Sequence, residues 1–468
     1  MTKKIIPERY ERLAVVDITA KGMGVLKTEE GKVIFVSGVI PGDQVTVETF
    51  KKRRRYFEAK LIHIDQPSPD RIVPRCEHFG VCGGCKWQNM QYQAQLEYKQ
   101  KEILHNLKNL SGMVLPKPEK IKSAVHPYFY RNKMEYTFSN RRWLTAEEVA
   151  HPSQDLIQNG LGFHKAGMWD KVVDIEQCHL QAEPANQIRN SIRTFALENQ
   201  MEFFNPKAQG GFLRTLMLRN TSAGEWMVLI QFFKEDEKKR KALLDYLKKT
   251  FNLTSLLYCI NSKANDTLYD QEIICYHGKP YLTEEMEGLK FKINAKSFFQ
   301  THTEQAYELY KITRDFAALR GDELVYDLYT GTGTIAQFIA GSCKKVVGIE
   351  SVPEAIAAAK ANALENKISN AFFEVGDMRK VFDKEFVKRH GKAEVVITDP
   401  PRNGMHPDVI KQLLLLEPKK IVYVSCNNAT QARDLFLMKE KYKLCRTQAV
   451  DMFPQTQHVE NVVLLEKI

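Results

Sequence analysis

Two kinds of hydrophobic segment are missing from this chain of 468 residues. It has no run of about 18 apolar residues, which excludes an ordinary membrane-spanning helix. The first residues, MTKKIIPERYERL, contain no long apolar core of the kind found in a secretory signal peptide. We therefore expect a cytoplasmic protein with reduced thiols and no membrane contact.

Two phosphate-binding patterns and any internal repeat are missing as well. The glycine-bearing segment DLYTGTGTIAQFIA has Gln337 or its neighbours where the third glycine of G-x-G-x-x-G would stand. It also lacks the Gly-Lys-Ser/Thr of a P-loop. These absences speak against a dinucleotide or nucleoside triphosphate as the ligand of this loop.

The size and charge of the chain point to several domains and a polyanionic partner. A chain of 468 residues is too long for one hydrophobic core, so about two or three domains are expected. The formal net charge is +11 and the isoelectric point is near 9.0. Such a basic balance favours nucleic acid, through contacts to phosphates and release of counterions.

The N-terminal region alternates apolar and polar residues between turn signals up to about Asp65. Short segments separated by glycines and by Pro41-Gly42-Asp43 predict a small β-barrel. KKRRRYF, Lys51 to Phe57, places five cations before two aromatic residues, which suits phosphates and base stacking. A solvated hairpin tip is the structural alternative. QPSPDRIVP, Gln66 to Pro74, indicates a linker.

The rest of the chain shows two different patterns of helix and strand signals. Helical spacing of Leu and Ile predicts a helix from Gln91 to about Leu110. Strand-like runs and amphipathic helices then alternate between about Pro127 and Tyr281, which indicates an α+β region. After Leu289 the alternation of strands and helices is typical of a parallel doubly wound sheet. Its strand signals are ELVYDLY, KKVVGIE, AFFEVGD, EVVITDPP and KIVYVSC.

Three successive strand ends of this sheet carry carboxylates. Asp327 precedes a turn in which Gly331 and Gly333 allow a ligand to approach backbone amides. Glu350 ends the next strand, where a carboxylate can accept ribose hydroxyls, and Asp377 ends the third. Clustered carboxylates would repel a pyrophosphate, so S-adenosylmethionine fits better than NAD. Helix capping by these acids is the structural alternative.

Reactive side chains follow the next two strands. Asp399-Pro400-Pro401-Arg402 comes after one strand, and the prolines stiffen the backbone that holds the Asp and Arg. Cys426 follows the neighbouring strand, so these residues are expected at the same sheet edge. A cysteine could belong to the core instead, but Asn427 and Asn428 mark a strand exit. We expect covalent chemistry at Cys426.

Four further cysteines indicate a metal site. In a reducing compartment the nine cysteines are not expected to form structural disulfides. Cys76, Cys82 and Cys85 lie close together in the sequence, and Cys178 supplies a distant fourth thiolate. Tetrahedral zinc and an iron–sulfur cluster both suit this set, and the spacing does not decide between them.

Together, the motifs DLYTGTGT, GIE, ITDPPR, VSCN and HVENVVLL resemble those of the RNA uracil-carbon-5 methyltransferases. The resemblance spans essentially the whole chain and is closest to the bacterial 23S rRNA branch, which carries a TRAM domain and a [4Fe–4S] cluster. It implies a multidomain protein with an OB-like TRAM β-barrel and a C-terminal α/β Rossmann-like class I methyltransferase domain. The implied parts are a barrel over 1–66, a central α+β domain with the cysteine cluster over 67–92 and 125–285, a helix over 93–124 that packs on the catalytic domain, and the methyltransferase domain over 286–468.

The resemblance also implies a mechanism. The thiolate of Cys426 adds to carbon-6 of uracil, carbon-5 attacks the sulfonium methyl group, and Glu460 removes the carbon-5 proton before the cysteine is eliminated. Asp399 and Arg402 organise the pyrimidine and the methyl donor. The residues expected around S-adenosylmethionine are Gln300, Asp327, Tyr329, Gly331, Thr334, Glu350, Asp377 and Asp399. The ligands expected for the [4Fe–4S] cluster, or alternatively for zinc, are Cys76, Cys82, Cys85 and Cys178.

Two positions depart from the family pattern. Asn428 stands where a proline often follows the cysteine motif, and His302 stands where Gln-x-Asn has its asparagine. The expected partner is RNA containing an unpaired or flipped-out uridine. 23S rRNA is favoured and the T-loop of tRNA is the alternative, with the enzyme acting as a monomer.

Two other functions use the same features. A non-catalytic RNA-binding factor could keep the fold, although Cys426 and Glu460 together argue against it. An adenine-amino methyltransferase also carries Asp-Pro-Pro, but that class places an aromatic residue next, to stack the base, whereas this chain has Arg402.

Overall fold

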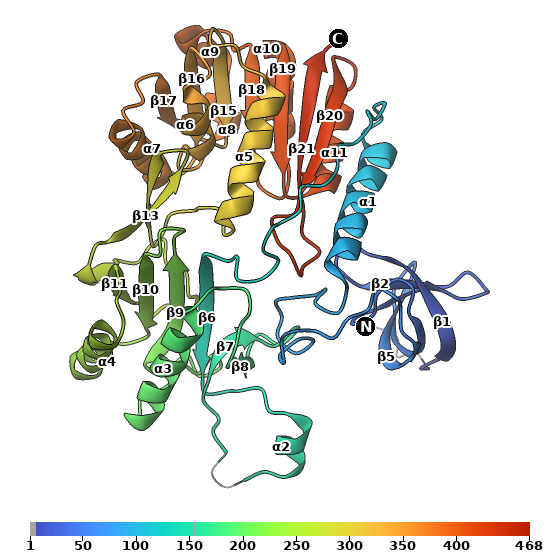
Figure 1. Cartoon of the computed structure of the whole chain (residues 1–468), viewed down its shortest axis with the longest axis vertical. Helices are drawn as coiled ribbons and strands as arrows, with labels where there is room; N and C mark the ends of the chain where they lie inside the picture. The colour runs from blue at the N-terminus through green and yellow to red at the C-terminus, as the bar shows by residue number, and fades with distance from the viewer. Residues whose placement is uncertain (1–5, 154–155) are drawn as a thin grey trace.

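The computed structural model describes residues 6–153 and 156–468, which form three parts (Figure 1). They are a closed barrel near the N-terminus, a central seven-stranded sheet, and a second seven-stranded sheet towards the C-terminus. Residues 1–5 and 154–155, which belong to the expected first and central domains, lie outside the described ranges.

The N-terminal barrel confirms the β-barrel that the sequence predicts. Its interior is filled by apolar residues that alternate with exposed ones, among them Val15, Leu26, Ile34 and Val47. The first strand pairs with both the second and the fourth, so the barrel closes and leaves no free sheet edge. The strands are β1 (Arg9–Ile18), β2 (Gly24–Lys27), β3 (Val33–Val36), β4 (Gln44–Lys52) and β5 (Phe57–Gln66).

The basic segment KKRRRYF forms the hairpin that joins β4 to β5. Lys52 ends one strand and Phe57 begins the next, so the arginines lie at the turn. Arg53 donates to Glu58 across the hairpin at 2.7 Å. The hairpin alternative and the RNA-binding interpretation are therefore compatible, because a hairpin tip presents its cations to solvent.

The central sheet has the strand order β12-β11-β10-β9-β6-β7-β8, and only β10 and β11 run parallel within it. Two helices bury apolar side chains against the sheet, including Ile188 and Leu243. The strands are β6 (Lys133–Ser139), β7 (Gly160–His164), β8 (Val172–Asp174), β9 (Leu213–Asn220), β10 (Trp226–Phe232), β11 (Ser255–Ile260) and β12 (Ile274–Gly278). The helices of this part are α2 (Ala146–Ala150), α3 (Ala185–Glu198) and α4 (Glu237–Thr250).

A two-stranded hairpin leads into the C-terminal sheet, whose order is β17-β16-β15-β18-β19-β21-β20. The five predicted strands form its parallel part. The hairpin strands are β13 (Tyr281–Met286) and β14 (Leu289–Asn294). The sheet strands are β15 (Leu324–Leu328), β16 (Lys345–Glu350), β17 (Ala371–Val375), β18 (Val395–Thr398), β19 (Lys420–Ser425), β20 (Tyr442–Val450) and β21 (Glu460–Lys467).

One strand of the C-terminal sheet, β21, departs from the predicted parallel direction. β21 runs antiparallel to both β19 and β20 and lies between them. Antiparallel neighbours need only a hairpin connection, so the chain completes the sheet without another crossover helix. Glu460 therefore begins a strand that lies beside β19, the strand that ends at Ser425 directly before Cys426.

Helices cover both faces of this sheet. One face packs on α5 to α7 through residues such as Phe316 and Ile339, and the other packs on α8 to α11 through residues such as Val409 and Leu435. Successive side chains of a strand point to opposite faces of the sheet, so alternate residues pack into the two cores. The helices are α5 (Thr303–Ala317), α6 (Thr334–Ala340), α7 (Pro353–Glu365), α8 (Met378–Val381), α9 (Lys384–His390), α10 (Pro407–Leu416) and α11 (Asn428–Met438).

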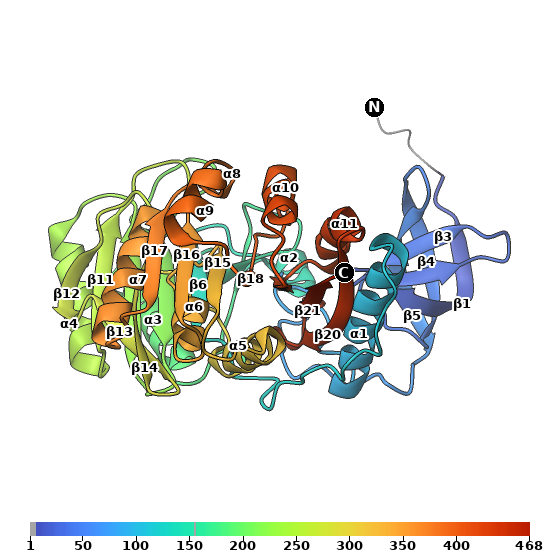
Figure 2. The ribbon, with the colours of Figure 1, turned by 90° about the horizontal axis from the view of Figure 1, so that it is seen from above.

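One helix from the N-terminal half joins the second of these cores. α1 (Tyr92–Leu110) lies beside α11, between the barrel and the C-terminal sheet (Figures 1 and 2). Leu96, Ile103 and Leu107 are buried in the same core as residues of the C-terminal sheet. The chain thus passes from the barrel to the C-terminal sheet before it builds the central sheet.

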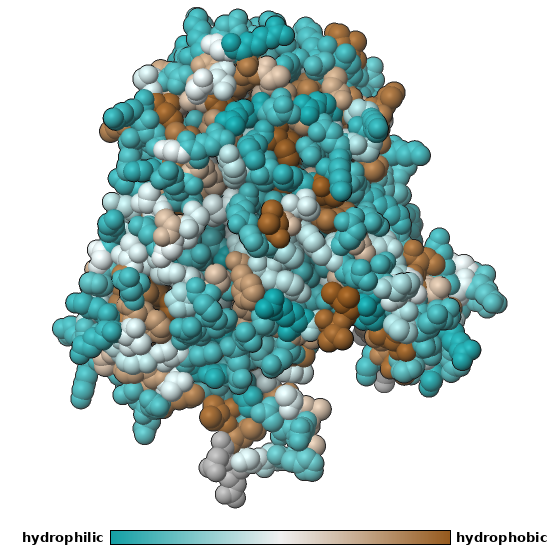
Figure 3. All heavy atoms as spheres, in the orientation of Figure 1, coloured by the Kyte–Doolittle hydropathy of each residue, from teal (hydrophilic) through white to brown (hydrophobic). Residues whose placement is uncertain are grey.

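The surface seen in Figure 3 is mostly hydrophilic, with small separate groups of apolar residues. Across residues 6–153 and 156–468, every helix is too short or too polar to traverse a lipid bilayer.

Candidate active site

The turn between β15 and α6 has an unusual backbone. Tyr329, Gly331 and Gly333 all have positive φ angles, of 64°, 56° and 73°. A Cβ atom on Gly333 would lie 2.7 Å from the Phe373 ring, so this position requires glycine. The turn therefore stays tight at the N-terminus of α6.

Two carboxylates surround this turn in different ways. Glu350 Oε2 accepts from the Gly331 N–H at 3.3 Å, while Oε1 accepts from the N–H of Val352 at 3.0 Å. Asp327 is only 1% exposed; Oδ2 accepts from Thr330 at 2.5 Å, and Oδ1 has no hydrogen-bond partner in the described structure. Burial raises the pKa of Asp327 to about 7. An unpaired buried oxygen of this kind fits a ligand that brings its own donor, such as an ammonium group.

The remaining predicted cofactor residues are Asp377, Tyr329, Thr334 and Gln300. Asp377 caps α8 and accepts from the Arg379 side chain at 2.6 Å, which lowers the pKa of Asp377 to about 2. Burial raises the pKa of Tyr329 to about 12. Thr334 is buried at the start of α6. The Gln300 carbonyl accepts from Asn132 at 2.9 Å, just before α5.

The predicted reacting residues meet at one sheet edge. Cys426 directly follows β19 and Glu460 begins β21, and the pairing of Ser425 with Asn461 brings the two together. Asp399 follows β18, the other neighbour of β19. Arg402 lies near enough to hydrogen-bond the Cys426 thiolate and lower its pKa. These residues come from three segments, since Asp399 and Arg402 share the loop after β18, Cys426 follows β19, and Glu460 begins β21. The sheet order brings the three segments together.

Hydrogen bonds tie the Arg402 loop to the Cys426 loop. The Arg402 carbonyl accepts from Asn427 Nδ2 at 2.9 Å and from Thr430 Oγ1 at 3.2 Å. Asn427 also caps α11, because its Oδ1 accepts from the backbone N–H of Ala429 and of Thr430. The absent proline at Asn428 therefore does not leave the loop without support.

Burial governs the electrostatics of this edge. It raises the pKa of Cys426 to about 11, with further increases from Glu460 and Asp399 and an opposing effect from Arg402. Burial is also the first cause of the raised pKa values of Asp399 and Glu460, and the charge of Asp399 raises that of Glu460 further. The thiol is therefore protonated near neutral pH until something changes its surroundings, and the two carboxylates titrate closer to neutrality than ordinary acids.

Sequence reasoning missed two side chains that face this edge. Tyr310 on α5 is buried where the charges of Asp399, Asp327 and Glu460 all act on it. His458 lies where Arg402 lowers its pKa, although burial is the larger cause. Tyr310 has no sequence signal, because it occupies an ordinary apolar position of a helix.

His302, the second departure from the family pattern, lies in the interior. It is 1% exposed, stacks on Tyr130 with ring centroids 4.4 Å apart, and its Nδ1 is 3.0 Å from the Met452 carbonyl. Burial lowers its pKa to about 4, so the ring is neutral. It therefore links Tyr130, just before β6, to Met452, just after β20.

The four clustered cysteines come together far from Cys426 in sequence. All are free thiols, and Cys178 is buried while the other three are partly buried. Burial raises the pKa of Cys85 to about 12, and the charges of Cys178, Cys82 and Cys76 raise it further. The four sulfurs therefore lie within electrostatic reach of one another.

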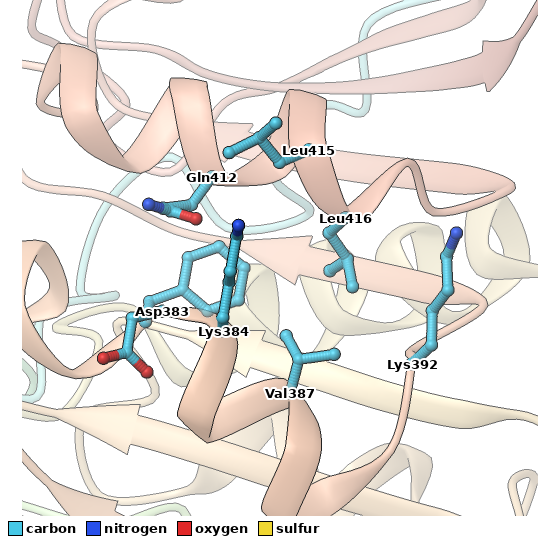
Figure 4. A pocket seen from close by; sticks show the side chains of 8 residues that line it. Asp383, Lys384, Val387, Lys392, Gln412, Leu415 and Leu416 are labelled. Carbon is cyan, nitrogen blue, oxygen red and sulfur yellow. The ribbon is translucent and has the colours of Figure 1, made fainter.

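A hollow of about 240 Å³ lies elsewhere, between α9 and α10 (Figure 4). Val387, Leu415 and Leu416 line it together with Lys384 and Lys392. It contains none of the residues described above, so we do not assign the chemistry to it.

Comparison with known proteins shows the family of this chain. A family model described as tRNA (Uracil-5-)-methyltransferase matches residues 213–468. The chain belongs to this family. A Porphyromonas gingivalis protein named as an uncharacterized RNA methyltransferase is 49% identical over 461 residues, covering 97% of this chain and 99% of that protein. A Bacteroides thetaiotaomicron protein of the same name is 50% identical over 453 residues, covering 96% and 100%.

A solved structure resembles this RNA uracil-5 methyltransferase over most of its length. It is the Pyrococcus abyssi tRNA (uracil-54, C5)-methyltransferase in complex with S-adenosyl-L-homocysteine. The TM-score is 0.76 with 29% sequence identity, and the match covers 97% of this chain and all of that one. The protein is thus an S-adenosylmethionine-dependent RNA methyltransferase with a Rossmann-like catalytic domain and an N-terminal barrel.

Proposed function

We propose that this enzyme forms 5-methyluridine in 23S rRNA through a covalent bond between Cys426 and the target uracil. The observation that carries the proposal is the meeting of Cys426, Glu460, Asp399 and Arg402 at one sheet edge, beside the glycine turn. Uracil carbon-5 is a weak nucleophile until a thiolate adds to carbon-6, so a nucleophile and a base are both needed. We expect a monomer that acts in the cytoplasm, where thiols stay reduced.

The first step uses the thiol and its nearest bases. The Cys426 thiol transfers its proton to Asp399, whose raised pKa makes its carboxylate a competent acceptor near neutral pH. Sulfur bonds to carbon-6, and the electron pair of the carbon-5–carbon-6 double bond moves towards oxygen-4. Arg402 stabilises the negative charge that develops, first on sulfur and then on the ring.

The later steps restore the aromatic ring. After carbon-5 has gained the methyl group, the Glu460 carboxylate takes the carbon-5 proton and the bond between sulfur and carbon-6 breaks. Cys426 leaves as a thiolate and recovers its proton from Asp399. Glu460 then releases its proton to solvent, so that one proton leaves for each methyl group transferred.

The residues around the glycine turn fit S-adenosylmethionine, which supplies an electrophilic methyl group when bound. Asp327 Oδ1 is buried without a partner and suits the ammonium of an amino acid moiety. Glu350 suits the ribose hydroxyls, and Asp377 would have to share its carboxylate between Arg379 and an adenine amine. Gln300, Tyr329 and Thr334 would complete the walls of the pocket.

The motif resemblance favours a [4Fe–4S] cluster over zinc at the four clustered cysteines. Soft thiolates suit either centre. Within residues 6–153 and 156–468, no three His, Cys, Asp or Glu side chains are close enough to hold a metal ion. The charges of Cys178, Cys82 and Cys76 raise the pKa of Cys85, so the thiols are neighbours, and the choice of centre rests on the resemblance. Cys76, Cys82, Cys85 and Cys178 would hold the cluster, in a structural role.

A tRNA T-loop uridine is the second candidate substrate, and one observation favours it. The Pyrococcus abyssi enzyme is named for uracil-54 of tRNA, and it aligns with 97% of this chain. The barrel and the central part therefore do not by themselves exclude a tRNA substrate. Our preference for rRNA depends on the motif resemblance described above.

A deletion strain separates these candidates. We expect mass mapping of its RNA to show one or more 5-methyluridines missing from 23S rRNA, with the T-loop of tRNA unchanged. In vitro, the purified enzyme should transfer methyl groups to a 23S rRNA fragment at least about tenfold faster than to a tRNA transcript. Loss of the tRNA methyl group alone would replace the first candidate by the second, and no loss in either RNA would contradict both.

A further inference from the structure

The loop that ends at Glu460 is held by parts of the chain outside the methyltransferase sheet. This loop, residues 451–459, joins β20 to β21 and is called the base loop below. Figure 1 shows it below these strands, beside the lower end of α1. Val450 and Glu460 flank the base loop and pair directly with each other across the hairpin. Any shift of the base loop therefore changes the position of Glu460.

A buried ion pair holds the start of the base loop. Lys99 on α1 lies 2.5 Å from Asp451, and both side chains are fully buried. Tyr92 donates to the other oxygen of Asp451 at 2.7 Å, and Lys99 also donates to the Phe453 carbonyl at 3.1 Å. Burying such an ion pair costs desolvation energy that offsets its attraction. We therefore infer that it serves to fix the position of the base loop against α1 rather than to add stability.

A reciprocal amide pair holds the middle of the base loop. Gln95 Nε2 donates to Gln455 Oε1 at 3.0 Å, and the Gln455 N–H donates back to Gln95 Oε1 at 3.0 Å. Both residues are buried, at 0% and 3% exposure. Gln455 also has a φ of 67°, a conformation that a non-glycine residue keeps only when its surroundings impose it.

The cysteine segment contacts the same residue. The backbone N–H groups of Lys86 and Trp87, directly after Cys85, donate to the Gln455 carbonyl at 2.9 and 3.1 Å. Gln95 Nε2 in turn donates to the Trp87 carbonyl at 2.9 Å. Gln95 and Gln455 therefore join α1, the cysteine segment and the base loop into one hydrogen-bonded unit.

Two further side chains contact backbone carbonyls of the base loop. Tyr130 donates to the Pro454 carbonyl at 3.0 Å, and His302 lies against the Met452 carbonyl. Burial keeps these bonds from exchanging readily with water. The base loop is thus held by hydrogen bonds from several segments of the chain, all of them before Glu460 in its path.

We propose that Gln95 and Gln455 are positioning residues for the reaction, because they hold the base loop so that Glu460 can reach the carbon-5 proton. This inference rests on the proposed role of Glu460. The cysteine segment then also affects catalysis. Displacement of its backbone would shift Gln455, and through the base loop it would shift Glu460. The inference predicts a defect in one step only, the resolution of the covalent RNA adduct.

The test measures that step in Gln95→Leu, which keeps the volume and removes the amide. We expect the covalent enzyme–RNA adduct to resolve at least about tenfold more slowly, with the KM for S-adenosylmethionine within about twofold of wild type. Radiolabelled RNA on denaturing gels reports the adduct fraction over time. Gln100→Leu is the matched control, because Gln100 lies on the same helix and bonds only the backbone of Glu119 and Ile121.

A second variant keeps the test valid if Gln95→Leu folds poorly. Gln455→Asn tolerates the positive φ and removes the side-chain bond from Gln95 Nε2, while the backbone N–H of residue 455 still donates to Gln95 Oε1. Adduct resolution should therefore slow as in Gln95→Leu, but by a smaller factor. Adduct resolution at the wild-type rate in the folded variants would overturn the inference while leaving the proposed function intact, provided that Glu460→Gln traps the adduct. If Glu460→Gln traps none and methylates normally, the role of Glu460 and this inference both fall.

Discussion

Cys426 and Cys85 are thiols in two regions of the molecule, and they differ in their neighbours rather than in their burial. Burial raises the pKa of both, to about 11 and about 12. Around Cys426 the other charges are Glu460, Asp399 and Arg402. Around Cys85 they are the other thiols of its own cluster.

This difference separates a reactive thiol from a ligand. A thiol beside bases and a guanidinium can lose its proton when a substrate displaces water, because proton acceptors and a stabilising cation are already in place. Thiols that face one another only repel as thiolates, and a soft metal centre removes that repulsion. Each region can therefore be tested by an experiment whose main readout belongs to that region.

The largest effect is expected for the reactive thiol. Cys426→Ala should lower methyl transfer by at least about 10⁴-fold, because no other nucleophile can activate carbon-5. Calorimetry should show S-adenosylmethionine binding within about twofold of wild type. Cys445→Ala, a partly buried cysteine of the same domain, is the control and should stay active. Methyl transfer by Cys426→Ala near the wild-type rate would remove the distinction between the two regions.

A smaller but more specific effect is expected at the base. Glu460→Gln should lower turnover by about 10²- to 10⁴-fold, because methyl transfer can occur while proton removal cannot. The methylated RNA should stay bound to the protein and run as a covalent adduct on denaturing gels. If normal methylation occurs without any adduct, Glu460 is not the base.

The cysteine cluster is expected to affect composition and stability more than chemistry. Cys85→Ala should lose iron and visible absorbance in anaerobic preparations, and its melting temperature should fall by several degrees. Methyl transfer per folded molecule should fall by no more than about tenfold. Cys259→Ala, a fully buried cysteine of the central sheet, should lose stability without losing iron. Wild-type protein that is colourless and rich in zinc would reverse the cluster assignment.

The smallest effect is the pH dependence, which belongs to the catalytic edge alone. Asp399 and Glu460 must both be ionised to accept protons, and burial raises both pKa values. The rate of a single turnover, limited by one of these two proton transfers, should therefore increase as pH rises from about 5.5 to about 8, up to about tenfold per pH unit at the acid end. An ordinary carboxylate would already be ionised over this range, so a flat profile would contradict the raised pKa values. Iron content should not change over the same range.

The sequence allowed much of the fold to be predicted, because local patterns specify it. The five strand signals after Leu289 became β15 to β19, since buried parallel strands read as continuous apolar runs. The position of β21 could not be predicted in the same way. Its apolar residues fit either direction, and only pairing with β19 and β20 made it antiparallel.

The same holds for the candidate site. Asp399 and Cys426 were expected at one edge, because consecutive parallel strands end on the same side. That Glu460 lies near Cys426 was implied only by resemblance. The geometric reason is the strand order β19-β21-β20, which places the start of β21 beside the end of β19. Tyr310 was not predicted at all, since its helix position carries no pattern that distinguishes it from a core residue.

By itself, the sequence determined which elements form and which side chains stand at their ends, because hydrophobic periodicity and turn residues act over short distances. Only the tertiary structure decided that Lys99 would neutralise Asp451, and that Gln95 would meet Gln455 more than 300 residues further along the chain. Such pairs leave no local signal, since a polar residue in a helix and one in a loop look solvated until packing excludes the water between them.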